Sequence, residues 1–478
     1  MSFNSIPYLV YLPLVFGVYW LLPARKWQNI FLLAASYFFL GYVQPWFAAL
    51  IFAVSSVNYL AGLAMERWPE KRRYILTAAL VFCLGVLGYF KYADFFLDNV
   101  SALLQALGLP SFRWSLGIIL PVGISFYTFQ ALAYSVDVYR QEVKPQRKFI
   151  DFCLFISFFP QLVAGPIERS ADLMPQVEKR RRVTPAMINH GLLLLVWGFF
   201  KKLVIADNTG LIAYKVFSLN EPGFYMLWAG VFAFAIQILA DFWAYTDIAR
   251  GSALLLGFRL SRNFDHPYFA TSPADFWRRW HMSLSYWLRD YVYIPLGGSR
   301  VPPARAAGNI MLTFLLSGLW HGASWNFVLW GGYHGLLVLL HRWLRKITSL
   351  LRIPVPHILR PGIRSGKRLV TFGLVCIGWL LFRVTDTDRL LHLLQLTPWQ
   401  EDPASRGIAA YLFFLGLLYS LPIWLHGLAH LRWMRHHRLD DTLPRAALMA
   451  RPLLMALLLL GILVLRSPEP ATFIYFQF

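Results

Sequence analysis

The residues best suited to chemistry in this chain centre on the histidine at position 321. His321 stands among small residues, between Gly318 and Ser324, inside a stretch that is otherwise apolar. An ionisable side chain at membrane depth is costly, and it usually faces a cavity or a partner. Imidazole titrates near neutrality, so His321 is predicted to be a general base that takes a proton from an attacking hydroxyl. The alternative is a histidine hydrogen-bonded inside a helix bundle, and the residues alone leave both open.

A second histidine, His281, lies in an aromatic and basic segment, residues 275–298. Tryptophan and leucine recur there at helical spacing with arginines between them, which predicts a helix in the membrane interface. This helix would belong to a long cytoplasmic segment over residues 249–307. Arg278 and Arg279 either anchor it among headgroups or bind the phosphates of a cytosolic acyl donor. Spacing does not decide the role of His281.

One acidic residue, Asp241, lies deep in the apolar run 224–248. A carboxylate there could orient a catalytic imidazole, and we predict that Asp241 and Trp320 lie beside the substrate. Phosphate-binding glycine loops, a His-Glu-x-x-His helix and a Gly-x-Ser-x-Gly turn are missing from the sequence. Because these motifs are absent, we predict that the protein has no metal site and does not hydrolyse nucleotides.

The composition places these residues in a membrane protein. Of the 478 residues, 58% are hydrophobic and 14% are charged, whereas a soluble chain has about 25% charged residues. The net charge of +21 falls in short basic clusters between apolar runs, which is the positive-inside pattern and not a nucleic-acid surface. We predict an all-α, polytopic membrane protein with about 10 to 12 transmembrane helices. It should form a single domain over residues 1–478, with a catalytic region at about 240–341.

Ten apolar runs have roughly the length of a transmembrane helix. They cover residues 6–22, 29–44, 46–64, 74–92, 115–136, 188–205, 224–248, 367–382, 408–430 and 446–465. Basic residues at 25–26 and 66–73 put those two loops on the cytoplasmic side. The N-terminus is therefore predicted to lie in the periplasm.

Two apolar segments do not fit a simple zigzag. Residues 149–164 are short, contain Pro160 and have basic residues on both flanks, which predicts a re-entrant segment. Residues 308–341 also have basic residues on both flanks, so they must enter and return. Their first limb, 308–320, would be about 20 Å long as a helix and would reach part way. The turn is predicted between Trp320 and Ser324.

Several blocks of the sequence resemble the bacterial membrane-bound O-acyltransferases, and most closely their alginate O-acetyltransferase subgroup. These blocks are Asn263–Ser299, with the motif WRRWH, Leu316–Gly335, with the motif WHG, residues 87–96, 120–140, 158–169 and 198–207, and the ending FIYFQF. They follow one another in order over nearly the whole chain. The two histidine motifs are the most specific part of the likeness.

The resemblance implies a ring of transmembrane helices, with re-entrant hairpins, around a thinned centre that a tunnel crosses. It assigns catalysis to His321 of the WHG block and a second functional position to His281 of the WRRWH block. It implies a cytosolic thioester donor, such as acetyl-CoA, without a permanently bound cofactor. The protein would lie in the bacterial inner membrane and acetylate an exopolysaccharide such as alginate or cellulose. Its expected partners are periplasmic acetyltransferases and the machinery of polysaccharide synthesis and secretion.

Other activities compete with this hypothesis. A family relative could transfer D-alanine to teichoic acid, or acylate a lipid or a protein. A transporter or flippase is the rival from another class, and transporters often contain repeated halves with broken helices in matching positions. The sequence has no evident second copy of the WHG hairpin, which favours an enzyme.

Overall fold

The computed structural model describes residues 1–111, 116–163, 165–351, 356–433, 445–469 and 471–476. Within these ranges the chain folds into α-helices with short 3₁₀ and π turns, and it has no strand. Each of the ten apolar runs contains a helix, although the run at 115–136 becomes helical only at Ile124. The predicted all-α, polytopic fold class is confirmed.

Six helical segments of the described chain are long and apolar enough to cross a membrane. They are α3 (Trp46–Arg67), the continuous segment Pro69–Ala106, the segment Pro185–Phe217, α12 (Phe224–Leu255), α17 (Arg360–Arg383) and α19 (Pro403–Trp433). Other apolar helices are shorter, such as α1 (Ile6–Leu21), α2 (Arg25–Gly41) and α6 (Ile124–Tyr139), with 16 or 17 residues each. Such helices are about 24 to 26 Å long, below the ~30 Å of a typical hydrocarbon core. The chain is a multi-pass membrane protein.

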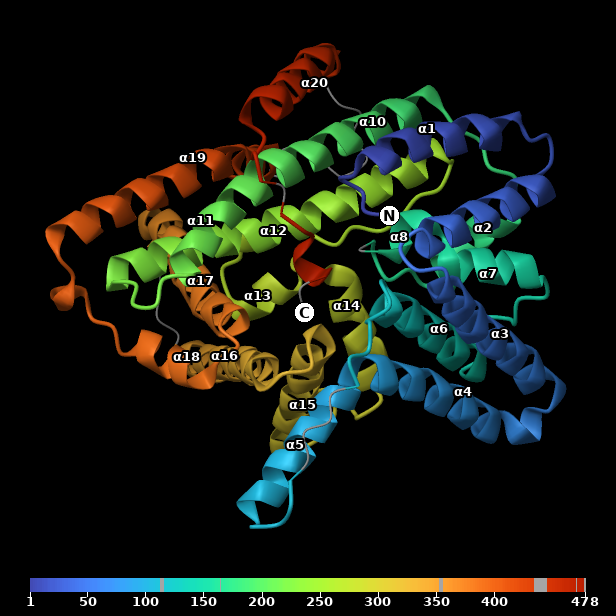
Figure 1. The fold of residues 1–478 in the computed structure, drawn as a ribbon, viewed down its shortest axis with the longest axis horizontal. Coiled ribbons are helices and arrows are strands. Elements are labelled where there is room, and N and C mark those ends of the chain that lie inside the picture. Colours follow the sequence, from blue (N-terminus) through green and yellow to red (C-terminus); the bar gives the residue numbers. More distant parts are fainter. Residues whose placement is uncertain (112–115, 164, 352–355, 434–444, 470, 477–478) are drawn as a thin grey trace.

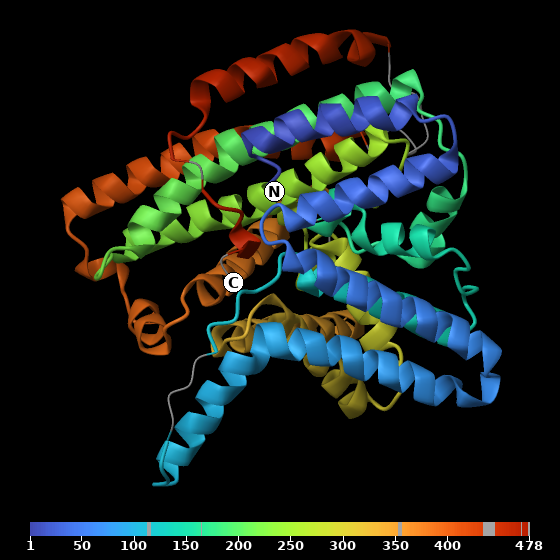
Figure 2. The same ribbon diagram turned by 45° about the vertical axis from the view of Figure 1, so that its right-hand side comes forward.

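Helix α12 forms the centre of the second half of the chain. Its most apolar 18-residue stretch is 94% buried, and it packs against α10 (Pro185–Phe200), α11 (Asp207–Phe217), α17 and α19. By contrast, α19 and α20 (Arg445–Leu465) expose many leucines, as expected of helices that face lipid. Figures 1 and 2 show the red C-terminal segment ending in the middle of the molecule and α5 (Ala93–Ala106) projecting away from it.

Residues 149–163 fold into two short helices inside the protein. Helix α7 (Phe149–Ser157) and helix α8 (Phe159–Leu162) are separated by a break at Phe158. The nine residues of α7 are about 14 Å long and cannot cross a bilayer. Residues 151–163 are all buried, so protein covers this broken backbone as membrane depth requires. The prediction that this segment does not cross as one span is confirmed for its described residues, and position 164 lies outside them.

Helices α15 (Pro303–His321) and α16 (Trp325–Leu351) form the second hairpin, with its turn at residues 322–324 as predicted. The predicted length of the first limb was wrong. Helix α15 begins at Pro303, a residue suited to a first helical turn, and includes five residues that the sequence analysis had assigned to the preceding loop. Its 19 residues are about 28 Å long, so the limb is close to a full membrane crossing.

Two glycines allow the hairpin helices to cross closely. A Cβ atom at Gly318 would lie 2.1 Å from the carbonyl oxygen of Phe327, and one at Gly331 would lie 2.3 Å from that of Phe314. Neither position has room for a side chain. The close crossing therefore fixes the end of α15, where His321 lies.

The predicted interfacial helix over residues 275–298 was wrong. The segment forms α13 (Pro273–Trp277) and α14 (Met282–Leu288), with a break between them. At the break, His281 has a φ of 42°, in the left-handed region that residues with a side chain rarely adopt. Trp280 and its neighbouring tryptophans are buried in the protein. Helical spacing identified an aromatic face, but it did not show that protein, and not headgroups, covers that face.

Candidate active site

The two histidines of the sequence motifs meet inside the protein. The ring centroids of His281 and His321 are 6.4 Å apart, and the indole of Trp320 lies edge-on to both, at 5.6 and 5.0 Å. His321 is 3% exposed and His281 is fully buried. Neither imidazole forms a hydrogen bond to another described residue. Buried polar groups are nearly always hydrogen-bonded, so two free imidazoles indicate a site that receives a ligand.

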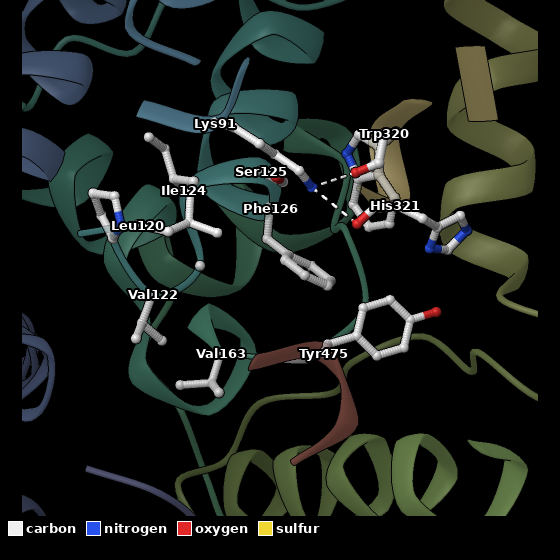
Figure 3. A pocket seen from close by; sticks show the side chains of 12 residues that line it. Lys91, Leu120, Val122, Ile124, Ser125, Phe126, Val163, Trp320, His321 and Tyr475 are labelled. Carbon is white, nitrogen blue, oxygen red and sulfur yellow. Dashed lines mark hydrogen bonds between the residues drawn. The ribbon is translucent and has the colours of Figure 1, made fainter. Parts of the chain in front are cut away.

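His321 lines a small cavity of about 130 Å³. Its walls are formed by Lys91, residues 120–126, Val163, Trp320, His321 and Tyr475. Figure 3 shows these side chains around the space, with Phe126 and Tyr475 presenting aromatic rings to it. The cavity is mainly apolar, with the imidazole, the ammonium of Lys91 and the phenol of Tyr475 as its principal polar groups.

Lys91 caps the helix that carries His321. Its ammonium donates hydrogen bonds to the carbonyl oxygens of Trp320 and His321, drawn as dashed lines in Figure 3, and Tyr92 donates to that of Leu319 at 2.8 Å. These carbonyls end α15 without helical partners, and a cation stabilises the negative end of a helix. Both donors come from a π turn, η2 (Gly88–Tyr92), between α4 (Arg72–Leu87) and α5. Lys91 is not among the residues predicted from the sequence, although a lysine inside the apolar run 74–92 is a signal of function.

The C-terminal tail, residues 471–476, brings Tyr475 to His321. The ring centroids of Tyr475 and His321 are 5.6 Å apart, and Tyr475 also packs on Phe242 of α12 at 4.5 Å. The sequence analysis had noted the ending FIYFQF only as a family resemblance. Its last two residues, 477 and 478, lie outside the described residues.

A buried ion pair holds this tail in place. The ammonium of Lys202, in the π turn η3 (Lys201–Ala206), lies 3.0 Å from Asp241 and donates a hydrogen bond to the carbonyl of Ala471. Asp241 accepts the backbone N–H of Ile474 at 2.8 Å. The prediction that Asp241 orients an imidazole or contacts the substrate is therefore corrected. Its carboxylate binds Lys202 and the backbone of the tail that carries Tyr475.

A second, larger cavity of about 440 Å³ lies one turn back along α15. Ser317 of α15 lines it, together with apolar residues of α13, α14 and α16 and a group of basic side chains. That group consists of Arg278, Arg289, His341, Arg342 and Arg345. Trp277 forms part of its wall and packs edge-on against Trp330, which packs in turn against His321. An aromatic wall thus lies between the basic cavity and His321.

The two predicted phosphate-binding arginines have different surroundings. Arg278 lines the basic cavity, and its side chain is 71% exposed. Arg279 is absent from the lining of that cavity. Its guanidinium lies 3.0 Å from Asp275 and 3.7 Å from Asp265, so the grouping of the two arginines was wrong. The two residues are consecutive in the turn that follows α13, and their side chains point in different directions.

The family model of the membrane-bound O-acyltransferases matches residues 141–381. The probable alginate O-acetylase AlgI of Azotobacter vinelandii is 41% identical over 393 residues, which cover 81% of this chain and 76% of that protein. The AlgI protein of Pseudomonas putida is 35% identical over the full length of both chains. A peptidoglycan O-acetyltransferase of Helicobacter pylori is 34% identical over 83% of this chain and 79% of its own. The chain belongs to the membrane-bound O-acyltransferase family.

This O-acyltransferase holds part of its site outside the residues that the family model matches. The matched residues include His281, His321 and the basic cavity. Lys91 and Tyr475, which line the small cavity beside His321, lie on either side of the match. Segments before and after the matched residues therefore help to form this cavity, together with Val163, Trp320 and His321 within the match.

Proposed function

We propose that this O-acyltransferase passes an acetyl group from a cytosolic thioester across the bacterial inner membrane, for O-acetylation of an exopolysaccharide such as alginate or cellulose. One observation carries the proposal: α15 lines two unlike cavities one helical turn apart, at Ser317 and at His321. A reaction that joins reactants from two compartments needs such an arrangement. The names of the AlgI and peptidoglycan relatives support a polysaccharide as the final acceptor.

The basic cavity suits an acyl thioester such as acetyl-CoA. It combines an apolar wall with Arg278, Arg289, Arg342 and Arg345, and arginine binds phosphate groups through paired hydrogen bonds. The positive-inside rule assigns the basic ends of these helices to the cytoplasm. From the same rule we expect the N-terminus and the small cavity to lie toward the periplasm.

The small cavity is large enough for an acceptor hydroxyl carried by a thin part of a molecule, such as a side chain. Its volume of about 130 Å³ is below the ~300 Å³ at which pockets for small molecules begin. A polymer chain does not fit there. We therefore expect a periplasmic acetyltransferase partner to take up the acetyl group and deliver it to the polysaccharide.

In the proposed reaction, His321 is the general base. Its neutral imidazole takes the proton of the acceptor hydroxyl as the oxygen attacks the thioester carbonyl. The new C–O bond forms, the C–S bond breaks, and the proton passes from the imidazole to the leaving thiolate. His281 lines neither cavity, but its ring contacts Trp320 and lies 6.4 Å from that of His321. Its proposed role is to stabilise the developing oxyanion with an N–H of the imidazole. Exchange of one acyl bond for another requires no nucleotide hydrolysis.

Proteoliposomes that contain the full chain test the donor and the direction together. Labelled acetyl-CoA is supplied on one side, and a periplasmic partner or an acetyl-free alginate or cellulose oligosaccharide on the other. The proposal predicts label on the acceptor and release of one thiol for each group transferred. Label from a D-alanyl carrier but not from acetyl-CoA would favour the teichoic acid alternative, and transport of an unaltered solute without thiol release would favour a transporter. Either result would overturn the proposal.

A further inference from the structure

Three histidines and an aspartate cluster where the end of α19 meets the loop before α13. Asp265 and His266 belong to that loop, directly before the 3₁₀ turn η4 (Pro267–Phe269), while His426 and His430 lie one helical turn apart on α19. The Oδ1 atom of Asp265 is 3.2 Å from Nε2 of His430. The ring centroid of His266 is 4.8 Å from those of His426 and His430. None of the four residues lines either cavity of the active site.

We propose that Asp265, His266, His426 and His430 form a binding site for a divalent transition-metal ion, and that Zn²⁺ fits the ligand set best. One ligand atom each of Asp265, His266 and His430 lies within 4.8 Å of the other two. Zinc favours imidazole nitrogen and carboxylate oxygen in a tetrahedral arrangement. With bonds of about 2.0 Å, tetrahedral ligand atoms stand about 3.3 Å apart. The separation between Asp265 and His430 is already that of one tetrahedral edge.

His266 supplies the independent evidence for a ligand. Its side chain is buried, with 5% of the residue exposed, and its Nδ1 atom has no hydrogen-bond partner among the described residues. A Cβ atom at Gly427 would lie 3.0 Å from this nitrogen. The nitrogen therefore faces α19 between His426 and His430. Buried polar nitrogens nearly always have a partner. A metal ion bound between the loop and the helix would be the partner of this nitrogen.

The backbone and the ionisation state of His266 agree with a ligand role. Its φ of 46° lies in the left-handed region, which is costly for a residue with a side chain. Burial, together with the neighbouring His426 and His430, lowers the pKa of His266 to about 3. The imidazole is thus neutral, and a metal ion binds only the neutral form.

Asp265 also has the outer partner that metal-binding carboxylates usually have. While Oδ1 faces His430, Oδ2 lies 3.7 Å from the guanidinium of Arg279. Arg279 also donates to the backbone carbonyl of Asp265 and accepts its N–H at 3.0 Å. Second-shell contacts of this kind orient a ligand. The proposed ion would connect the end of α19 to Asp265. Through Asp265 it would also connect to Arg279, which lies two residues before His281.

The test is the metal content of the full chain, purified in detergent without a histidine tag. After exposure to Zn²⁺ and dialysis, we expect about one ion per chain by mass spectrometry. Substitution of Co²⁺ should give the intense visible bands of a tetrahedral complex. His266→Gln and His430→Gln should lose most of the bound metal, whereas His392→Gln, on the exposed side of α18 (Thr387–Leu394), should keep it.

Wild-type protein with much less than one ion per chain would overturn the proposal and leave an ordinary Asp265–His430 ion pair. Equal metal content in the wild type and in both glutamine variants would also overturn it, because the ion would then lie elsewhere. If a variant does not fold, the Co²⁺ spectrum of the wild type still decides. Metal content is measured without any acyl transfer, so the outcome does not depend on the proposed function.

Discussion

Lys91 and His321 meet through the backbone, because the ammonium of Lys91 donates a hydrogen bond of 3.2 Å to the carbonyl oxygen of His321. Neither nitrogen of the same imidazole has a hydrogen-bond partner among the described residues. The chain therefore holds His321 through its main chain and leaves its side chain available. The consequences of this arrangement can be measured.

Replacement of Lys91 by methionine should lower the kcat of acyl transfer by about tenfold to a hundredfold, since a small displacement of a catalytic group has effects of that size. The KM for the donor should change little, because Lys91 does not line the basic cavity. Steady-state kinetics with labelled acetyl-CoA separate the two constants. Lys215→Met, on an exposed part of α11, is the matched control. Full kcat in Lys91→Met would show that the cap does not position His321.

Substitution of Gly318 by alanine should push α15 and α16 apart and displace His321. The added methyl would meet the backbone of Phe327, which cannot move as a side chain can, and overpacking costs about 1 to 3 kcal/mol. Gly308→Ala is the control on the same helix, because a Cβ there meets nothing within 4 Å. Thermal unfolding in detergent should show a loss of stability for Gly318→Ala and none for Gly308→Ala. Equal melting temperatures would contradict the close crossing.

Asp241 should affect activity through the tail. Asparagine at this position keeps an oxygen that can accept the N–H of Ile474, whereas alanine removes it. We expect transfer to fall in the order wild type, Asp241→Asn, Asp241→Ala, with the C-terminus of the alanine variant cleaved fastest in limited proteolysis. Lys202 keeps Asp207 as a partner in both variants. Equal activity and equal cleavage in the two variants would argue against this role.

Arg278 and Arg279 should differ in their effects. Arg278→Ala should raise the KM for acetyl-CoA by about tenfold or more. It removes a cation from the basic cavity, a phosphate contact with arginine is worth roughly 1.5 to 3 kcal/mol, and about 1.4 kcal/mol is a factor of ten. Arg279→Ala should chiefly lower the melting temperature, because it breaks the contacts with Asp275 and Asp265. Donor titrations and thermal unfolding of both variants check this. A raised KM in Arg279→Ala alone would reverse the assignment.

The family motifs singled out His281 and His321 one by one, and apolar run lengths predicted the helices. The sequence did not predict what depends on long-range packing. Lys91 and Tyr475 reach the site from opposite ends of the chain, and no local pattern shows such a contact. The deep position of Asp241 in an apolar run suggested a catalytic role. Its partners, however, are Lys202 on another helical segment and the backbone of the tail, and the sequence does not show these contacts. The residues of the cluster at His266 come from a loop and from α19. A zinc-binding motif on a single helix, such as His-Glu-x-x-His, therefore does not identify them.

The central claim is that His321 performs the acyl transfer, and a His321→Ala comparison tests it most directly. Wild type, His321→Ala and the control His392→Ala are inserted in equal amounts into proteoliposomes, and thiol release from acetyl-CoA is followed with an acceptor present. We predict that His321→Ala loses at least about a hundredfold in rate, as expected for loss of a general base, while its melting temperature stays near that of the wild type. A correctly inserted His321→Ala protein that transfers acetyl groups at the wild-type rate would contradict the account.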